Sequence, residues 1–121
     1  MLIQDFVKRA IEQDKRNYFE ETVVEKFVPN ELKEFYEKAN PVDVEISMDG
    51  NAVRLIPMSE LEDFQAEYSL GESRFAFASC NGDPIYVYDE KIYTCCHGIG
   101  KVKDELMANS LSERVRKSLE I

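Results

Sequence analysis

Short β-rich runs separated by tight turns fill the second half of this 121-residue chain, and they constrain its fold more than any other feature. The runs are rich in β-branched and aromatic residues, as strands are. Turn sequences separate them, namely Asp49-Gly50-Asn51, Asn81-Gly82-Asp83-Pro84 and Asp89-Glu90-Lys91, and Asp-Gly favours a tight hairpin. Strands joined by tight turns pair antiparallel, so the sequence predicts a largely antiparallel sheet. The predicted strands are Val42–Ile46, Ala52–Ile56, Arg74–Ala78, Ile85–Tyr88 and Ile92–Cys96.

Helical periodicity marks the remaining segments. Apolar residues recur every three or four positions from Leu2 to about Arg16, and again between a helix entry at Val28–Leu32, where Asn30 can cap, and a stop at Asn40-Pro41. Two Ser-x-x-Glu capping boxes, starting at Ser59 and Ser110, predict two further helices. Tyr18–Phe27 fits either a strand or a helix. The expected fold class is therefore α+β, a single domain over residues 1–121 with a mostly antiparallel sheet flanked by helices.

The net charge of −9 is concentrated in the middle of the chain. Residues 42–90 contain eleven acids and only Arg54 and Arg74 as bases, whereas acids and bases balance in the rest. Such a region repels phosphate backbones, which argues against nucleic-acid binding, and it attracts basic protein surfaces. A solvated surface that keeps the protein soluble is the alternative interpretation. The acids are Asp43, Glu45, Asp49, Glu60, Glu62, Asp63, Glu67, Glu72, Asp83, Asp89 and Glu90.

Segments that would direct the chain to a membrane or out of the cell are missing from the sequence pattern. No apolar run approaches the roughly 18 residues that span a bilayer, and the first residues are too acidic for a signal peptide. Cys80, Cys95 and Cys96 are an odd number of cysteines, and two of them are adjacent. These features predict reduced thiols and a cytoplasmic location.

Several residue groups could carry chemistry, and each fails a requirement. Cys95, Cys96 and His97 are consecutive, so they cannot wrap one metal ion, and nothing orients His97 for a thiol–imidazole pair with Cys95. Gly98-Ile99-Gly100 lacks the context of a phosphate loop. We therefore expect no catalytic residues, no metal and no cofactor, and a protein that is not an enzyme.

Acidic side chains at helical spacing give the candidate binding residues. Glu60, Asp63 and Glu67 lie at i, i+3 and i+7, so they form a stripe beside the apolar stripe of the predicted helix and should face water. Acids in a row on an exposed helix suit docking against a basic patch better than the paired carboxylates of a glycosidase, which face each other across a cleft. The predicted protein-binding residues are Glu60, Asp63, Glu67, Glu72, Asp83 and Tyr86. Sheet packing is the favoured alternative for Tyr86, Tyr88 and Tyr93.

Four segments, in this order and spacing, carry a family resemblance: Val28–Tyr36, Leu55–Leu61, Phe75–Ile85 and Ala108–Leu111. They resemble the proline-led aromatic helix, the strand-to-helix junction, the strand–Gly-Asp–strand core and the closing helix start of the SUKH superfamily. That superfamily comprises bacterial toxin-immunity proteins and the related fungal Smi/Knr cell-wall synthesis regulators. Asn40-Pro41 and Leu111 depart from its usual pattern. The resemblance covers roughly residues 27–119 and implies an α+β fold that acts by binding a protein.

These observations lead to one functional hypothesis and two alternatives. The chain is expected to be an immunity protein that neutralises a toxin, such as a nuclease with a basic groove, through an acidic surface. The first alternative is a regulatory adaptor of the cell-wall-synthesis-regulator type with a cellular partner, and the second is a small enzyme that uses Cys95 or His97. The oligomeric state is left open by the sequence.

Overall fold

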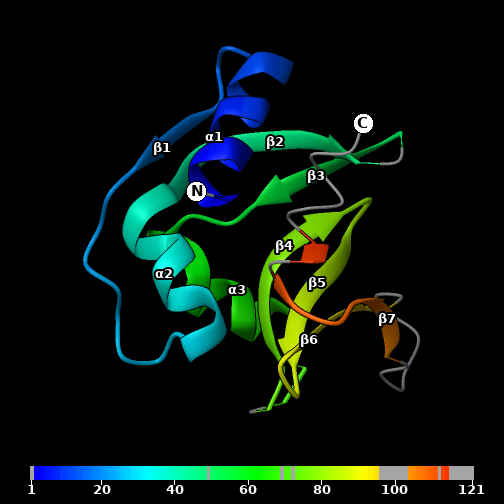
Figure 1. Cartoon of the computed structure of the whole chain (residues 1–121). Coiled ribbons are helices and arrows are strands. Elements are labelled where there is room, and N and C mark those ends of the chain that lie inside the picture. Colours follow the sequence, from blue (N-terminus) through cyan, green and yellow to red (C-terminus); the bar gives the residue numbers. More distant parts are fainter. Residues whose placement is uncertain are drawn as a thin grey trace.

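The computed structural model of the protein describes residues 2–48, 50–68, 70–71, 73–95, 104–111 and 113–114. Seven strands form one sheet in the order β1-β2-β3-β4-β5-β6-β7, and every neighbouring pair is antiparallel. Within the described residues, the helices α1, α2 and α3 accompany this sheet, which confirms the α+β class (Figure 1). The elements are α1 (Leu2–Gln13), β1 (Tyr18–Glu20), α2 (Asn30–Ala39), β2 (Asn40–Met48), β3 (Asn51–Leu55), the 3-10 turn η1 (Met58–Glu60), α3 (Leu61–Tyr68), β4 (Phe75–Cys80), β5 (Asp83–Tyr88), β6 (Lys91–Thr94) and β7 (Glu105–Ala108).

Two-residue turns fix the register of the central hairpins. Asn81 and Gly82 have φ values of 53° and 86° and join β4 to β5, where Cys80 pairs with Asp83. Asp89 and Glu90 have φ values of 51° and 66° and join β5 to β6. Two consecutive residues with positive φ are typical of a type I′ hairpin, whose twist matches that of the strands. The predicted turns at Asn81-Gly82 and Asp89-Glu90 are therefore confirmed, whereas Asp49 of the first predicted turn lies outside the described residues.

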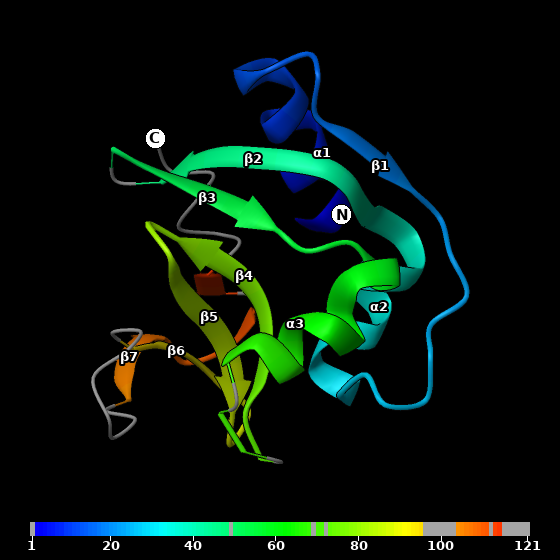
Figure 2. The same ribbon diagram turned by 180° about the vertical axis from the view of Figure 1, so that it is seen from behind.

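The helices cover the two faces of the sheet unequally. Phe6 of α1 and Phe35 of α2 lie near Val53 and Leu55 of β3, so α1 and α2 pack on that face. Arg54 points the opposite way, because side chains alternate along a strand. It contacts the turn η1, which leads into α3. Figures 1 and 2 show α1 and α2 towards one face and α3 towards the other. Buried apolar side chains from both sides form a single core cluster.

The helices lie where the sequence predicts them, but the residues at which they begin or end differ. The first helix ends at Gln13 rather than near Arg16, and Asn17 then donates to the carbonyl of Ala10 at 2.8 Å. Pro29 rather than Asn30 occupies the N-cap of α2, and its side chain makes no capping hydrogen bond. The capping box predicted at Ser59 is wrong, since Ser59 lies inside η1.

The second capping box is confirmed. Ser110 accepts a hydrogen bond at its Oγ from the backbone N–H of Glu113, at 3.0 Å, and the carboxylate of Glu113 reaches back to the N–H of Asn109. Two strands were not predicted: β1, within the segment left open at 18–27, and β7, which pairs with β6 at the edge of the sheet.

Gln65 of α3 completes the sheet where β3 ends. The last pair between β3 and β4 is Leu55 with Ala78, and the register of β4 shifts between Ala76 and Ala78. Ala76 is fully buried at this point. The side-chain amide of Gln65 accepts from the N–H of Ala76 at 2.7 Å and donates to its carbonyl at 2.6 Å. A side chain thus takes the place of a missing strand residue and holds α3 against the sheet.

Candidate functional site: an acidic surface along the third helix

Four acids of η1 and α3 are exposed to solvent: Glu60, Glu62, Asp63 and Glu67. The opposite side of the same helix buries Leu61 and Phe64 in the core, so the acids occupy the outward side. No Lys or Arg occurs in either η1 or α3. Acids in the first turn also interact favourably with the positive end of the helix dipole, which helps this short helix to form.

The ion pairs of the described residues place one base, Arg54, against the turn η1 that precedes this helix. Arg54 Nη2 is 3.0 Å from Glu60 Oε1, and both side chains are about half exposed. Exposed pairs of this kind contribute little stability, because water screens the charges and the side chains lose freedom. The pair therefore orients Glu60 and leaves the charges of Glu62, Asp63 and Glu67 without an ion-pair partner among the described residues.

Asp83 lies beside the other end of α3. The hydroxyl of Tyr68 donates to the carbonyl of Gly82 at 2.8 Å and so ties the end of the helix to the β4–β5 turn. Burial is the main cause that raises the pKa of Tyr68, and the charges of Glu67 and Asp83 raise it further. We call Glu60, Glu62, Asp63, Glu67 and Asp83 the acidic surface. It contains four of the six residues that the sequence singled out for binding.

The remaining two predicted residues are Glu72 and Tyr86. Glu72 lies outside the described residues. Tyr86 is fully buried, so the prediction that it is an exposed contact residue is wrong. Its ring stacks on Tyr93 with centroids 6.1 Å apart, and its hydroxyl donates to the carboxylate of Asp104. Tyr86 therefore packs within the sheet, which is the alternative interpretation given for it above.

A partly buried cluster surrounds that hydroxyl. Arg74 donates to Asp104 through two nitrogens, Nε at 2.9 Å and Nη2 at 2.8 Å, and its guanidinium lies over the ring of Tyr88 at 4.4 Å. The hydrogen bonds from Arg74 are the main cause that lowers the pKa of Asp104, with the bond from Tyr86 adding to them. Burial, followed by the bond to Asp104, raises the pKa of Tyr86. No local pattern in the sequence predicts this cluster, because Arg74 and Asp104 are thirty residues apart.

This cluster has the features of a structural anchor. The Asp104 carboxylate receives three hydrogen bonds from Arg74 and Tyr86, and the bidentate pairing with arginine is the strong geometry for a carboxylate. A carboxylate whose pKa is lowered in this way is a weak proton acceptor. The cluster instead fastens the start of β7 to β4 and β5, since Asp104 directly precedes β7.

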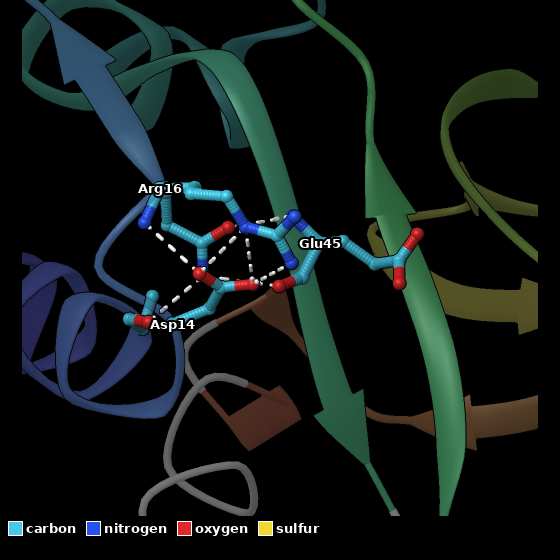
Figure 3. Close-up of polar contacts among 5 residues, drawn as sticks. Asp14, Arg16 and Glu45 are labelled. Carbon is cyan, nitrogen blue, oxygen red and sulfur yellow. Dashed lines mark hydrogen bonds and ion pairs between the residues drawn. The ribbon is translucent and has the colours of Figure 1, made fainter.

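A second group of charged side chains, Asp14 and Arg16, lies on the surface just after the end of α1. Figure 3 shows Asp14 and Arg16 beside Glu45 of β2. Arg16 donates to Asp14 from its backbone N–H at 2.9 Å and from its guanidinium at 2.8 Å. The side-chain bond from Arg16 is the main cause that lowers the pKa of Asp14 to about 2. The neighbouring Asn17 bonds both the N–H and the carbonyl of Glu45 at 3.0 Å, so this group belongs to the turn that joins α1 to the sheet.

Metal-binding clusters and membrane-spanning helices are both absent from the described part of the chain. No cluster of three or more His, Cys, Asp or Glu residues there could hold a metal ion. Cys95 is buried, whereas Cys96 and His97, considered above as ligands, lie outside the described residues. Among the helices of the described residues, none combines the length and the apolar character needed to cross a lipid bilayer.

The acidic surface thus has four exposed acids and the half-buried Asp83, with Arg54 beside Glu60, and it shows no convergent catalytic groups in the described residues. It can bind a positively charged surface by long-range attraction and by hydrogen bonds to carboxylates. No protein-family model matches this sequence, and no curated protein matches it either.

Proposed function

We propose that this chain is a non-enzymatic binding protein that recognises a basic protein partner through its acidic surface. The observation that carries the proposal is that Glu62, Asp63 and Glu67 are exposed on α3, with the exposed Glu60 in the turn η1 before it and Asp83 near its other end. Acids arranged in this way raise the rate of encounter with a basic partner.

An immunity protein is the specific role that we propose. Its partner would be a toxin domain with a basic groove, such as a nuclease, whose positive groove normally receives phosphates. Binding of carboxylates in that groove would block the toxin without any reaction by this chain. The resemblance of residues 27–119 to the SUKH superfamily supports this role, and a cytoplasmic location, where an incoming toxin acts, is part of the proposal.

Capture from the native cell tests the proposal. Tagged wild-type protein is compared with a triple variant, Glu60→Gln, Asp63→Asn and Glu67→Gln, and bound proteins are identified by mass spectrometry. A control variant, Glu31→Gln, Glu37→Gln and Glu105→Gln, removes the same charge from exposed positions away from the acidic surface. We expect the wild type and the control to retain a basic protein that the triple variant loses.

The identity of the captured protein distinguishes the two binding roles. A large protein with a basic toxin domain supports the immunity role. A cellular enzyme or scaffold supports the alternative of a regulatory adaptor. Capture that is equal for the wild type and the triple variant contradicts recognition by the acidic surface.

A further inference from the structure

The surface beside α1, on the opposite side of the sheet from α3, carries a different chemistry (Figures 1 and 2). An open groove runs along the helix there and is lined by the apolar side chains Ile3, Val7 and Ile11. These three residues are spaced four apart and so form one line along the helix. Phe6 and Ala10 bury the core side of α1, while Ile11 remains 40% exposed. The helix therefore has a second apolar line that this chain does not cover fully.

Charged side chains of both signs border this apolar line. Lys8 and Glu12 follow it along α1, and Glu21 and Lys38 line the opposite side of the groove. Lys8 and Glu12 are exposed, and neither forms an ion pair within the described residues. A basic partner would be matched by acids alone and an acidic partner by bases alone. A border with two charges of each sign is complementary to itself.

We propose that this groove is a dimerisation surface whose occupant is the same groove of a second copy of the chain. In a two-fold symmetric contact, one patch meets itself, so each group must find its complement on the same patch. Two antiparallel copies of α1 can set Val7 against Ile11 and Lys8 against Glu12 of the second copy. The two-fold symmetry forms each contact twice, so the dimer interface contains two apolar contacts and two ion pairs.

The distribution of charge favours self-association at this groove over any contact through α3. Residues 1–41, which contain the groove, carry nine acids and seven bases, and most of the net charge of −9 lies elsewhere. Repulsion between two copies is therefore smaller here than across the acidic surface. A dimer formed here leaves the acidic surface of each copy exposed, so the inference does not depend on the proposed function.

Sedimentation velocity over a range of concentrations tests the inference. We expect the wild type to change from monomer to dimer with a Kd of roughly 10–100 µM, as is typical of a small interface. Ile11→Glu should raise the Kd at least about ten-fold, because it removes apolar contact twice and adds two acids. Val23→Glu is the matched control, since Val23 is 89% exposed and lies outside the groove, and it should leave the Kd unchanged.

Charge exchange identifies the pairing. Lys8→Glu and Glu12→Lys each place like charges opposite one another, and each should raise the Kd about five-fold or more. The double variant restores opposite charges and should return the Kd to within about two-fold of the wild type. Circular dichroism confirms that each variant is folded. A wild type that stays monomeric up to about 500 µM, or a dimer that Ile11→Glu leaves intact, would overturn the inference.

Discussion

Replacing Gln65 by leucine should lower the free energy of unfolding strongly, because Gln65 of α3 bonds the buried backbone of β4. Leucine preserves the apolar volume but removes the two hydrogen bonds that Gln65 makes to the backbone of Ala76, at 2.6 and 2.7 Å. Because Ala76 is fully buried, water cannot replace these bonds, and a backbone N–H and a carbonyl are left unsatisfied. Each unsatisfied group costs about 1–2 kcal/mol, so the expected loss is about 2–4 kcal/mol.

Gln13 offers a matched control for this prediction. Its side-chain amide makes the same pair of bonds to the backbone of Ser47, at 2.9 and 3.4 Å, but both residues are exposed. Gln13→Leu should therefore cost less than about 1 kcal/mol, since water can satisfy the freed groups. Urea unfolding followed by circular dichroism gives both free energies of unfolding. A loss for Gln65→Leu no larger than that for Gln13→Leu would refute the reasoning.

Two further stability predictions follow from backbone strain and from the buried cluster. Glu90 adopts φ 66°, which disfavours side chains with a Cβ, so Glu90→Gly should stabilise the protein by about 0.5–1 kcal/mol; an unchanged urea midpoint would contradict this. Asp104→Asn should cost about 2 kcal/mol near neutral pH. The folded state lowers the pKa of Asp104, so this contribution is present above the unfolded pKa of about 4 and is lost as the pH falls through the folded value. Equal destabilisation by Asp104→Asn in neutral and strongly acidic urea titrations would contradict that assignment.

Local signals in the sequence predicted the parts of the fold that depend on neighbours in the chain. The turns at Asn81-Gly82 and Asp89-Glu90 marked the hairpins, because such turns dictate antiparallel pairing wherever they occur. The apolar stripe of α3 likewise predicted which side of that helix is buried, and so placed Asp63 and Glu67 on the outside.

Features that depend on distant segments could not be predicted in the same way. The strand β7 shows no alternation of apolar and polar residues, and its burial pattern follows from pairing with β6. The bond between Tyr86 and Asp104 depends on that pairing, so the part of Tyr86 in the buried cluster was missed. The role of Gln65 could not be predicted either. It depends on where the pairing of β3 with β4 ends and on α3 lying beside β4 at that point.

Recognition of a basic protein by the acidic surface is tested most directly by how the association rate depends on salt. The rate of binding to the captured partner is measured by stopped flow between low and high ionic strength, for the wild type and for the triple variant at Glu60, Asp63 and Glu67. Electrostatic attraction predicts a wild-type rate that falls steeply with salt, and a triple-variant rate that is at least about ten-fold lower at low salt and nearly independent of salt. Equal rates with the same salt dependence for the two proteins would contradict the proposed role of the acidic surface.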